Sequence, residues 1–390
     1  MTVLKTLFCL LGLLQDPDLD YLDPQDSRGI STAVVVKHAA LAHTAQVLPL
    51  DEQGVLVGKG DAPRQIDRVL EGLTLALHEA GSDLDRAVRI HVMAARPDVV
   101  DLVQQAFSRR FGGRAKPAAT FVVGTLAHPD ALVAMDAVAA APAAPSVRRF
   151  RSGSLPGVPG SSHVAVLPAG PAVFVSGQAT TQGPLGEATR TTLEGLRETL
   201  SFLGLKDEHV VQIKAFLKPM SDLSQVEAAI STFYGGRNIP PVVFVEWTLD
   251  PPIEIELVAA GPAKAEGPDA LRFLNPPGVK PSPVYSRVTR VDRGRLIYIS
   301  GLYGSGDAQG QVRGIFSSLK EILGKAGSDL RHLAKATYYV SDGPTTDALG
   351  KLRLEYFDPE RPPAASKAAV RNIGVQGKTI TLDMIGVAAP

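Results

Sequence analysis

Cysteine is almost absent from this sequence of 390 residues, because Cys9 is the only one. The chain beyond Cys9 therefore excludes disulfides and metal sites built on thiolates. An excess of charge of one sign is also absent, since 40 basic and 40 acidic residues balance. The net charge favours neither nucleic acid nor an anionic membrane as a partner, so we expect no nucleic acid among the partners.

Motifs for metal ions and phosphate groups are also missing. The eight histidines form no His-x-x-x-His or Glu-x-x-His pair on an expected helix. No Gly-x-x-x-x-Gly-Lys-Ser/Thr loop occurs, and the glycines of residues 301–306 have the wrong spacing for a dinucleotide fingerprint. The sequence therefore predicts no metal ion and no cofactor.

The apolar run at the N-terminus, residues 6–14, follows Lys5 and precedes a polar segment. It resembles a short signal peptide and is too short to span a bilayer as a helix. A frayed N-terminal segment is the alternative, because no Ala-x-Ala cleavage site follows, so export and a cytoplasmic location both stay open. Residues 16–28 are rich in Asp and Pro, and we expect an extended leader there. Signal peptide and leader together would occupy residues 1–26.

Internal repetition is what the sequence has in abundance. Leu-Glu-Gly-Leu at residues 70–73 recurs at 193–196, which is 123 residues later. Ala-Gly-Ser-Asp-Leu at residues 80–84 recurs at 326–330, after twice that distance. Each copy closes on an alternating strand, at residues 132–142, 253–262 and 380–390. These markers indicate three repeats of about 120 residues, which agrees with the size of ordinary domains.

The second copy shows the expected elements of a repeat. Residues 163–167 and 172–176 alternate as two strands, and the turn Pro168-Ala169-Gly170 predicts that they form a hairpin. Leucines at helical spacing predict a helix over 191–203. The remaining elements are a helix at 222–234 and strands at 210–217, 242–247 and 253–258. This order is a β-β-α-β-α-β-β module of the α+β class, with both helices on one face of a sheet.

The other two copies predict the same order. The first has helices at 65–80 and 99–111 and strands at 87–93, 119–125 and 132–138. The third has helices at 312–326 and 347–357 and strands at 334–340, 368–373 and 380–387. The connections at 141–161 and 263–283 are rich in Pro, Gly, Ala and Ser, which predicts flexible joints. We therefore predict domains at 27–142, 162–263 and 283–390, with linkers at 143–161 and 264–282.

Several of these features resemble the RidA/YjgF family. They are the strand that ends in Ser176-Gly177-Gln178, the Leu-Glu-Gly-Leu helix, the Ala-Gly-Ser-Asp-Leu turn, and the run 239–241 before a strand that ends in Ile-Glu-Ile-Glu. The resemblance covers all three repeats. It implies three RidA-like domains of chorismate-mutase-like fold that form an intramolecular pseudo-trimer, which would leave the chain monomeric. Ligand clefts for a small molecule would lie between neighbouring domains.

The resemblance also implies an activity, the hydrolysis of reactive enamines and imines such as 2-aminoacrylate to a keto acid and ammonia. The family mark is an Arg in a Pro-Ala-Arg-Ser/Thr segment, which holds the substrate carboxylate by two parallel hydrogen bonds. Ala119, Val242 and Ala365 occupy that position in the three copies. We therefore expect the deaminase activity to be weak or lost, since the substrate would not be held in an attack geometry.

Unlike the family Arg, the acidic residue of the family has a counterpart in each copy. Glu256 matches the family Glu on the last strand, which is thought to position water, and Asp136 and Asp383 are its shorter counterparts. The resemblance implies that Glu256 is catalytic and that the two Asp residues bind ligand. It assigns ligand binding also to the residues that follow the first long strand of the second and third repeats, namely Ser176, Gly177, Gln178, Ser300, Gly301 and Tyr303.

Two further residues are candidates for catalysis. His43 aligns with Ser176 and Ser300, and an imidazole there could act as acid or base, although a lone His at a strand end is more often structural. Lys367 follows Ala365 by two residues, so both side chains point to the same face of a strand. It could hold an anion or act as an amine nucleophile, while a solvated surface charge is the plainer interpretation. Trp247 is expected to pack in a core or an interface.

Two functions of different classes stay open on the sequence alone. One is a RidA/YjgF-like protein that binds or hydrolyses a small metabolite of the enamine or imine class. The other is a non-catalytic ligand-binding or scaffolding protein, which the divergence among the three copies favours.

Overall fold

The computed structural model describes residues 16–113, 115–180, 183–262 and 268–389. The expected signal peptide at residues 1–14 lies outside these residues.

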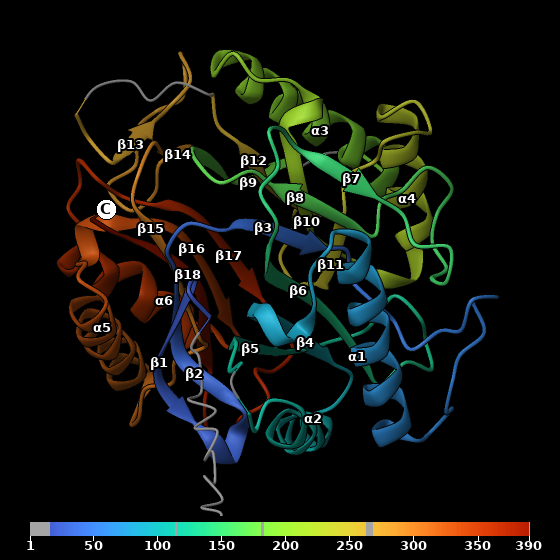
Figure 1. The fold of residues 1–390 in the computed structure, drawn as a ribbon. Helices are drawn as coiled ribbons and strands as arrows, with labels where there is room; N and C mark the ends of the chain where they lie inside the picture. Colours follow the sequence, from blue (N-terminus) through green and yellow to red (C-terminus); the bar gives the residue numbers. More distant parts are fainter. Residues whose placement is uncertain (1–15, 114, 181–182, 263–267, 390) are drawn as a thin grey trace, which may run out of the picture.

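The strands form three six-stranded sheets, arranged around a common centre (Figure 1). In spatial order, sheet 1 contains β5 (Ala118–Val123), β4 (Ala87–Ala94), β6 (Val133–Ala141), β3 (Ala40–Thr44), β8 (Val164–Leu167) and β7 (Arg148–Phe150). Sheet 2 contains β11 (Val242–Glu246), β10 (Val210–Leu217), β12 (Ile253–Ala260), β9 (Ala172–Thr180), β14 (Val288–Val291) and β13 (Leu271–Leu274). Sheet 3 contains β17 (Ala364–Ala369), β16 (Leu333–Val340), β18 (Ile380–Ala388), β15 (Arg295–Ile299), β2 (Ile30–Val36) and β1 (Leu19–Gln25).

Two helices per repeat lie on the outside of the molecule (Figure 1). They are α1 (Ala62–Glu79), α2 (Pro97–Arg110), α3 (Leu185–Phe202), α4 (Leu223–Phe233), α5 (Ala308–Lys325) and α6 (Gly343–Leu352). Several begin at an aspartate whose side chain accepts a hydrogen bond from a backbone N–H of the first turn, as Asp61, Asp307 and Asp342 do. The three tandem α+β units predicted from the sequence are confirmed. In the described ranges, no helix has the length and apolar character needed to cross a membrane.

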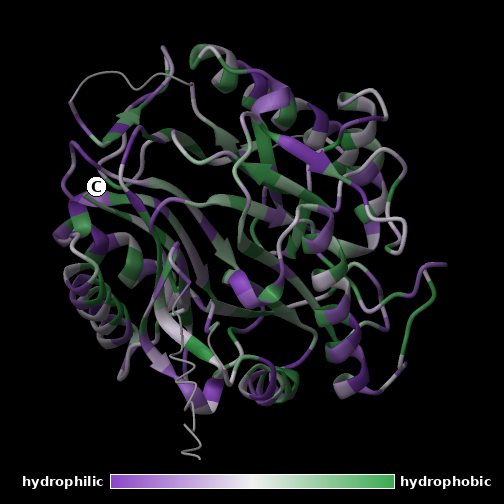
Figure 2. Ribbon diagram, in the orientation of Figure 1, coloured by the Kyte–Doolittle hydropathy of each residue, from purple (hydrophilic) through white to green (hydrophobic). Residues whose placement is uncertain are grey.

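The apolar residues form one core per repeat and two cores that the repeats share. In each repeat, the inner stripe of both helices packs against one face of a sheet. The opposite faces of all three sheets meet at the centre, where Leu41, Phe174 and Tyr298 belong to one cluster. A second shared cluster contains Phe216, Tyr339 and Trp247, so Trp247 is indeed a packing residue. Figure 2 shows the central strands as largely hydrophobic and the outer helices with polar residues facing outward.

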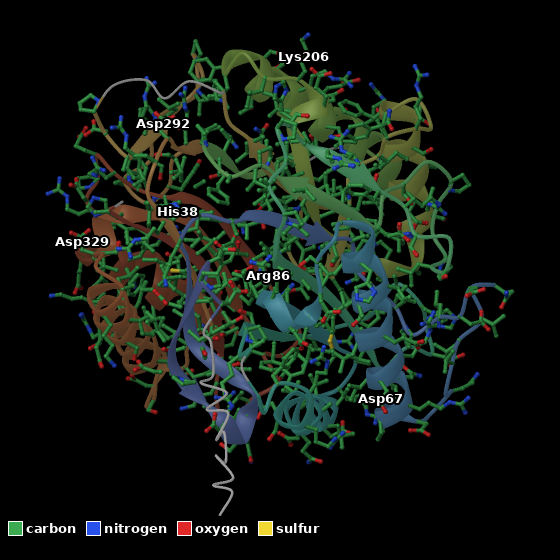
Figure 3. All side chains as sticks on the ribbon, in the orientation of Figure 1. His38, Asp67, Arg86, Lys206, Asp292 and Asp329 are labelled. Carbon is green, nitrogen blue, oxygen red and sulfur yellow. The ribbon has the colours of Figure 1, made fainter. Side chains whose placement is uncertain are left out.

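The repeats exchange strands in cyclic order. The first two strands of the second repeat, β7 and β8, join sheet 1, and β13 and β14 of the third repeat join sheet 2. The ring closes because β2 of the first repeat pairs with β15 of the third. The turns between exchanged and resident strands surround one cavity, and Figure 3 labels two of their residues, His38 and Asp292.

The predicted hairpin of the second repeat is therefore wrong. Both strands form, but β8 pairs with β3 and β7, whereas β9 pairs with β12 and β14. The turn Pro168-Ala169-Gly170 carries the chain from one sheet to the next. An alternating sequence pattern with a turn fits both a hairpin and two strands in different sheets. Packing between the repeats determines which strands pair.

The expected leader and linkers also need correction. Residues 16–28 were expected to form an extended leader, largely outside the first domain at 27–142, but Leu19–Gln25 forms β1, which pairs with β2 along six residue pairs. The linker 143–161 contains β7, and the linker 264–282 contains β13 in its described part. The strands β1, β7 and β13 each complete the edge of a sheet.

One strand of the third repeat was placed too late. The apolar residues 368–373 suggested a strand, but β17 begins at Ala364, directly after Pro363. The same register occurs in β5, which follows Pro117, and in β11, which follows Pro241. In these three parallel pairings Ala119, Val242 and Ala365 take equivalent positions, opposite residues 90, 213 and 336. The register thus supports the alignment of these three positions with one another.

Candidate functional site

Three equivalent junctions join the repeats where one long strand ends beside the first residues of another. We name them by their strands, as the β3/β11, β9/β17 and β15/β5 junctions. In the β9/β17 junction, Ser176 Oγ donates to the Ser286 carbonyl (2.6 Å) and accepts from the Ala365 N–H (2.7 Å). In the β15/β5 junction, Ser300 Oγ makes the same bonds, to the Ser31 carbonyl (2.6 Å) and from the Ala119 N–H (2.8 Å). These two serines connect strands of different repeats.

His43 does not take the equivalent place in the β3/β11 junction, so its alignment with the serines needs correction. His43 pairs with Val138, as Phe174 pairs with the equivalent Val258, and Ala45 therefore stands in the serine position. His43 lines a small interior cavity. Burial and the nearby charge of Arg89 lower its pKa to about 3, so the imidazole is neutral.

The acidic residues of the last strands lie at the centre of the molecule. Glu256, Asp136 and Asp383 are fully buried, opposite residues of the neighbouring strands β10, β4 and β16. Their partners are three buried cations, Arg89, Lys214 and Lys335. We name these six residues the central charge cluster.

Each carboxylate of the central charge cluster lies within ion-pair distance of at least one of its cations. Lys335 Nζ lies 2.7 Å from Glu256 Oε1, and Arg89 Nη1 donates to both oxygens of Asp383 at 2.7 and 2.8 Å. Lys214 Nζ lies 3.1 Å from Asp383 Oδ2 and 3.8 Å from Glu256 Oε1. Burial alone would raise the pKa of Asp383, but the three cations hold it well below its usual value. In the same way, the charges of Lys335 and Lys214 outweigh the effect of burial and lower the pKa of Glu256. The expectation that these acids line the clefts is therefore not met.

The acid of the β9/β17 junction is instead Glu254, which precedes Glu256 by two residues. Its Oε1 has no hydrogen-bond partner among the described residues. Burial, together with the charge of Glu256, raises the pKa of Glu254 to about 7, and the Ser366 hydroxyl and the charges of Arg287 and Lys367 offset only part of this effect. Gly177 lies directly against this carboxyl, because any side chain at 177 would overlap it.

Two cations accompany Glu254 in this junction. Lys367 is half-buried, on the same strand face as Ala365, and its charge acts on Glu254. Burial and the neighbouring Arg353 lower the pKa of Lys367. Arg287 Nη1 donates to the carbonyl of Gly177 (3.3 Å), and Gly177 is the residue that lies against the Glu254 carboxyl. The β9/β17 junction thus combines an acid with a near-neutral pKa and two cations, and perturbed groups of this kind cluster at functional sites.

The remaining predicted ligand-binding residues differ in their surroundings. Gln178 turns toward helix α3, where Nε2 donates to Thr199 Oγ1 (2.7 Å). The Gly301 N–H donates to the Ala119 carbonyl (2.9 Å) and joins the strands of the β15/β5 junction. Tyr303 packs against the shared cluster around Trp247, and burial raises the pKa of its phenol. None of these three contacts the Glu254 carboxyl through a hydrogen bond in the described part of the chain.

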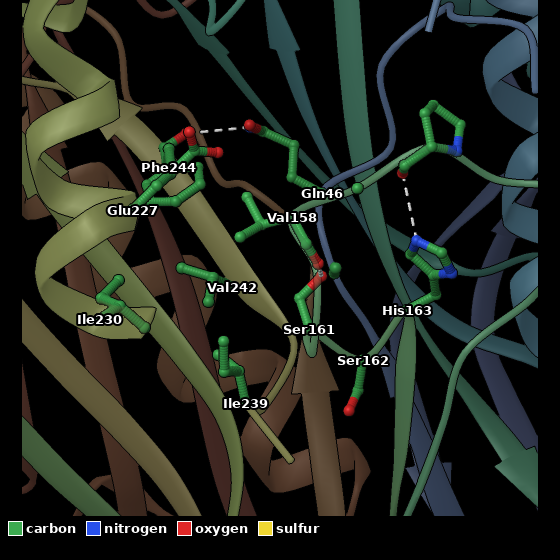
Figure 4. Close-up of a pocket in the computed structure, with 13 residues that line it drawn as sticks. Gln46, Val158, Ser161, Ser162, His163, Glu227, Ile230, Ile239, Val242 and Phe244 are labelled. Carbon is green, nitrogen blue, oxygen red and sulfur yellow. Dashed lines mark hydrogen bonds between the residues drawn. The ribbon is translucent and has the colours of Figure 1, made fainter. Parts of the chain in front are cut away.

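The β3/β11 junction contains a pocket of two adjoining cavities of about 110 and 210 Å³ (Figure 4). Its walls come from the end of β3, the loop 156–163, helix α4 and strand β11. Val242, where the sequence predicts the position of the family Arg, and Phe244 form one apolar wall. Gln46 and Glu227 project into the pocket from different sides, as Figure 4 shows.

Sequence reasoning missed Glu254, Arg287 and Glu227 as site residues. Glu254 had a signal, because a strand with period two places it on the same face as Glu256. Arg287 and Glu227 had none, since one lies at the entry to an exchanged strand and the other on the surface of a helix. Among the described residues, no group of three or more His, Cys, Asp or Glu side chains is placed to hold a metal ion.

Comparisons with known proteins find the same repeat pattern. The family described as "Endoribonuclease L-PSP" matches three times, at residues 28–141, 158–261 and 278–387. A RutC family protein of Pyrococcus abyssi is 29% identical over 104 residues, which are 27% of this chain and 81% of that protein.

Solved structures of single repeats are also similar to parts of the chain. The Rid family protein YyfB of Yersinia pestis has 21% identity and a TM-score of 0.27, over 30% of this chain and 99% of that chain. Rv2704 of Mycobacterium tuberculosis, a member of the YjgF/YER057c/UK114 family, has 26% identity and a TM-score of 0.23, over 27% of this chain and 86% of that chain.

Proposed function

We propose that this chain, which belongs to the RidA/YjgF family described as endoribonuclease L-PSP, binds and slowly hydrolyses a small enamine or imine at the β9/β17 junction. The observation that carries this proposal is Glu254, a buried carboxyl whose pKa of about 7 suits proton transfer at neutral pH. The arrangement of Arg287 and Lys367 beside it supports a site for an anionic metabolite.

The proposed reaction needs one group that both removes and returns a proton. Glu254 as a carboxylate takes a proton from water, whose oxygen forms a bond to the imine carbon. The proton passes to the imine nitrogen, so that a carbinolamine forms. Glu254 then moves the hydroxyl proton of the carbinolamine to the nitrogen, and the collapse breaks the C–N bond, forms the C=O bond, releases ammonia and leaves the keto acid. A pKa near the working pH keeps both protonation states of Glu254 populated during this cycle.

The proposed activity is weak because the fork of the family Arg is absent. Ala365 stands at that position in the β9/β17 junction, and the substrate carboxylate would be held by Lys367 and Arg287 instead. Lys presents a point charge on a flexible stem, whereas a well-placed guanidinium fixes a carboxylate by two bonds. Poorer positioning lowers the rate, since much of the catalytic effect comes from orientation.

The first experiment measures hydrolysis of 2-aminoacrylate, generated in situ and followed by its loss of absorbance. A single-domain relative that has the family Arg serves as the positive control. We expect the full chain to exceed the buffer rate and Glu254→Gln to lower kcat/KM by about 100-fold, as is typical for removal of a general acid or base. The matched control Glu198→Gln changes an exposed residue of α3 and should keep the wild-type rate.

The two cations are tested in the same assay. Lys367→Ala and Arg287→Ala should raise KM more than they lower kcat, because they remove binding of the substrate carboxylate. A wild-type rate in Glu254→Gln would contradict the proposed chemistry. A wild-type chain no faster than buffer would favour the non-catalytic alternative. Selective thermal stabilisation by keto acids or amino acids would then identify a binding protein, and a flat response a scaffold.

We also propose that the chain is a monomeric pseudo-trimer. Each sheet obtains its exchanged strands from within the chain, and the β2–β15 pairing closes the ring. Closed symmetry within one chain removes the need for further subunits. Light scattering should give a mass close to 41.2 kDa, and a mass three times larger would contradict this proposal.

A further inference from the structure

The β3/β11 pocket differs from the β9/β17 junction in its chemistry. Its described walls contain no Lys or Arg, and they are formed mainly by apolar residues such as Ile239, Val242 and Phe244. The ionisable side chains that line it are His163 and Glu227. The pocket therefore offers no fixed positive charge to a carboxylate ligand.

His163 is already engaged at both ring nitrogens. Nδ1 accepts from the Ser152 N–H (3.0 Å), so Nε2 carries the proton and donates to the Pro156 carbonyl (3.1 Å). Burial, together with the charge of Arg151, lowers the pKa of His163. The imidazole is therefore neutral, and it holds the wall of the pocket in place.

Gln46 has its hydrogen-bond donors engaged and an acceptor left over. Nε2 donates to the Phe244 carbonyl (2.9 Å) and lies 3.0 Å from Met93 Sδ. The Oε1 atom of Gln46 has no hydrogen bond to a described residue. Ser161 Oγ likewise donates to the Val158 carbonyl (2.6 Å), and only the Ser162 hydroxyl is unassigned. Most of the free hydrogen-bonding capacity of the pocket is that of an acceptor.

Glu227 provides the negative charge of the pocket. It is half-buried on helix α4, and no hydrogen bond or ion pair joins it to another described residue. Its desolvation raises the pKa of the carboxyl, which indicates that no cation among the described residues compensates its charge. A ligand that carries an ammonium group would supply the missing partner.

We propose that the β3/β11 pocket binds a small apolar primary amine, whose ammonium group donates to Glu227 and to Oε1 of Gln46 while its apolar body packs against Val242 and Phe244. A cavity of about 150 Å³ holds a benzene ring, so the space is sufficient for a single ring or a short branched chain. This site is separate from the β9/β17 junction and needs none of its chemistry.

The experiment titrates benzylamine, benzyl alcohol and benzoate into the full chain, with calorimetry and ligand-observed NMR as readouts. Benzylamine should bind, and benzoate should bind at least tenfold more weakly. Glu227→Gln should weaken benzylamine binding at least tenfold, because charge-assisted hydrogen bonds are stronger than neutral ones. The matched control Glu198→Gln should bind as the wild type does.

A second variant fills the pocket without changing its charge. Val242→Trp should abolish binding of all three probes, and its thermal unfolding temperature checks that the fold is kept. Equal affinity for benzoate and benzylamine, unchanged binding in Glu227→Gln, or no binding of benzylamine would each overturn the proposal. The Glu254→Gln variant should bind benzylamine normally, so failure of the proposed hydrolysis leaves this result unaffected.

Discussion

Glu254 and Glu256 lie two residues apart on β12 and have opposite surroundings. Glu256 belongs to the central charge cluster, where Lys335 lies 2.7 Å away and the pKa of the carboxyl is lowered. Glu254 belongs to the β9/β17 junction, where no ion pair joins it to a described Lys or Arg and the pKa is raised to about 7. The comparison teaches that buried charge by itself does not identify a reactive group. A carboxylate in close ion pairs with buried cations stabilises the structure, and one without such pairs is the candidate for the chemistry that we propose.

A second contrast separates the β9/β17 junction from the β3/β11 pocket. The strand register makes Phe244 equivalent to Lys367, and Ala134 equivalent to Glu254. The β3/β11 junction thus has apolar side chains at these two positions, and it has His163 at the position of Arg287. The three junctions therefore share a backbone arrangement and differ in the side chains at a few positions.

Breaking the central charge cluster should have the largest effect on stability. Asp383→Asn leaves Arg89 and Lys214 buried without their shared carboxylate, and we expect a loss of about 3–5 kcal/mol in the free energy of unfolding. Urea denaturation measures this loss. The control Asp67→Asn changes an exposed residue of α1, labelled in Figure 3, and should cost less than about 0.5 kcal/mol. A similar small cost for Asp383→Asn would mean that the cluster is not fully charged.

The pH dependence of stability should sharpen the contrast between the two glutamates. The pKa of Glu254 is raised from 4.5 to about 7 in the folded state, so its contribution to stability is full below pH 4.5 and is lost as the pH rises through 7. We expect a loss of up to about 3 kcal/mol, because one pKa unit corresponds to about 1.4 kcal/mol. Glu256 behaves oppositely, since its lowered pKa gives a contribution that is present above its unfolded value and lost in acid.

Unfolding of the wild type and of Glu254→Gln should be compared from pH 5 to pH 8. The stability of the variant relative to the wild type should increase across this range, because the variant has no carboxyl to ionise at 254. Parallel stability curves would show that the Glu254 carboxyl is not perturbed in the folded state, and would weaken the proposed role in catalysis.

Removal of the junction serines should have the smallest effect. Ser176→Ala and Ser300→Ala each leave a buried N–H and a buried carbonyl of another repeat without a partner, which should cost about 1–3 kcal/mol. The β3/β11 junction naturally has Ala45 at this position. Ala45→Ser should therefore change the free energy of unfolding by less than Ser176→Ala or Ser300→Ala does. Costs near zero for both serine variants would show that these bonds do not connect the repeats in solution.

Much of the fold could be predicted because its signals are local. The period of the helices, the duplicated Leu-Glu-Gly-Leu and Ala-Gly-Ser-Asp-Leu segments and the alternating last strands placed most elements within a few residues. The strand β10 was predicted with its observed bounds. The site was harder, because the junctions bring together residues of different repeats, and no spacing in the sequence relates Glu254 to Arg287 and Lys367.

The sequence by itself determined three tandem repeats, the α+β class of each, the family, and the absence of an Arg at positions 119, 242 and 365. Only the tertiary structure decided the strand exchange, the place of His43, and which glutamate of β12 reaches the centre. The physical reason is that a strand has a period of two, which places Glu254 and Glu256 on one face without saying what covers that face. The packing of the three sheets around a common centre supplies cations to one carboxyl and leaves the other at a junction.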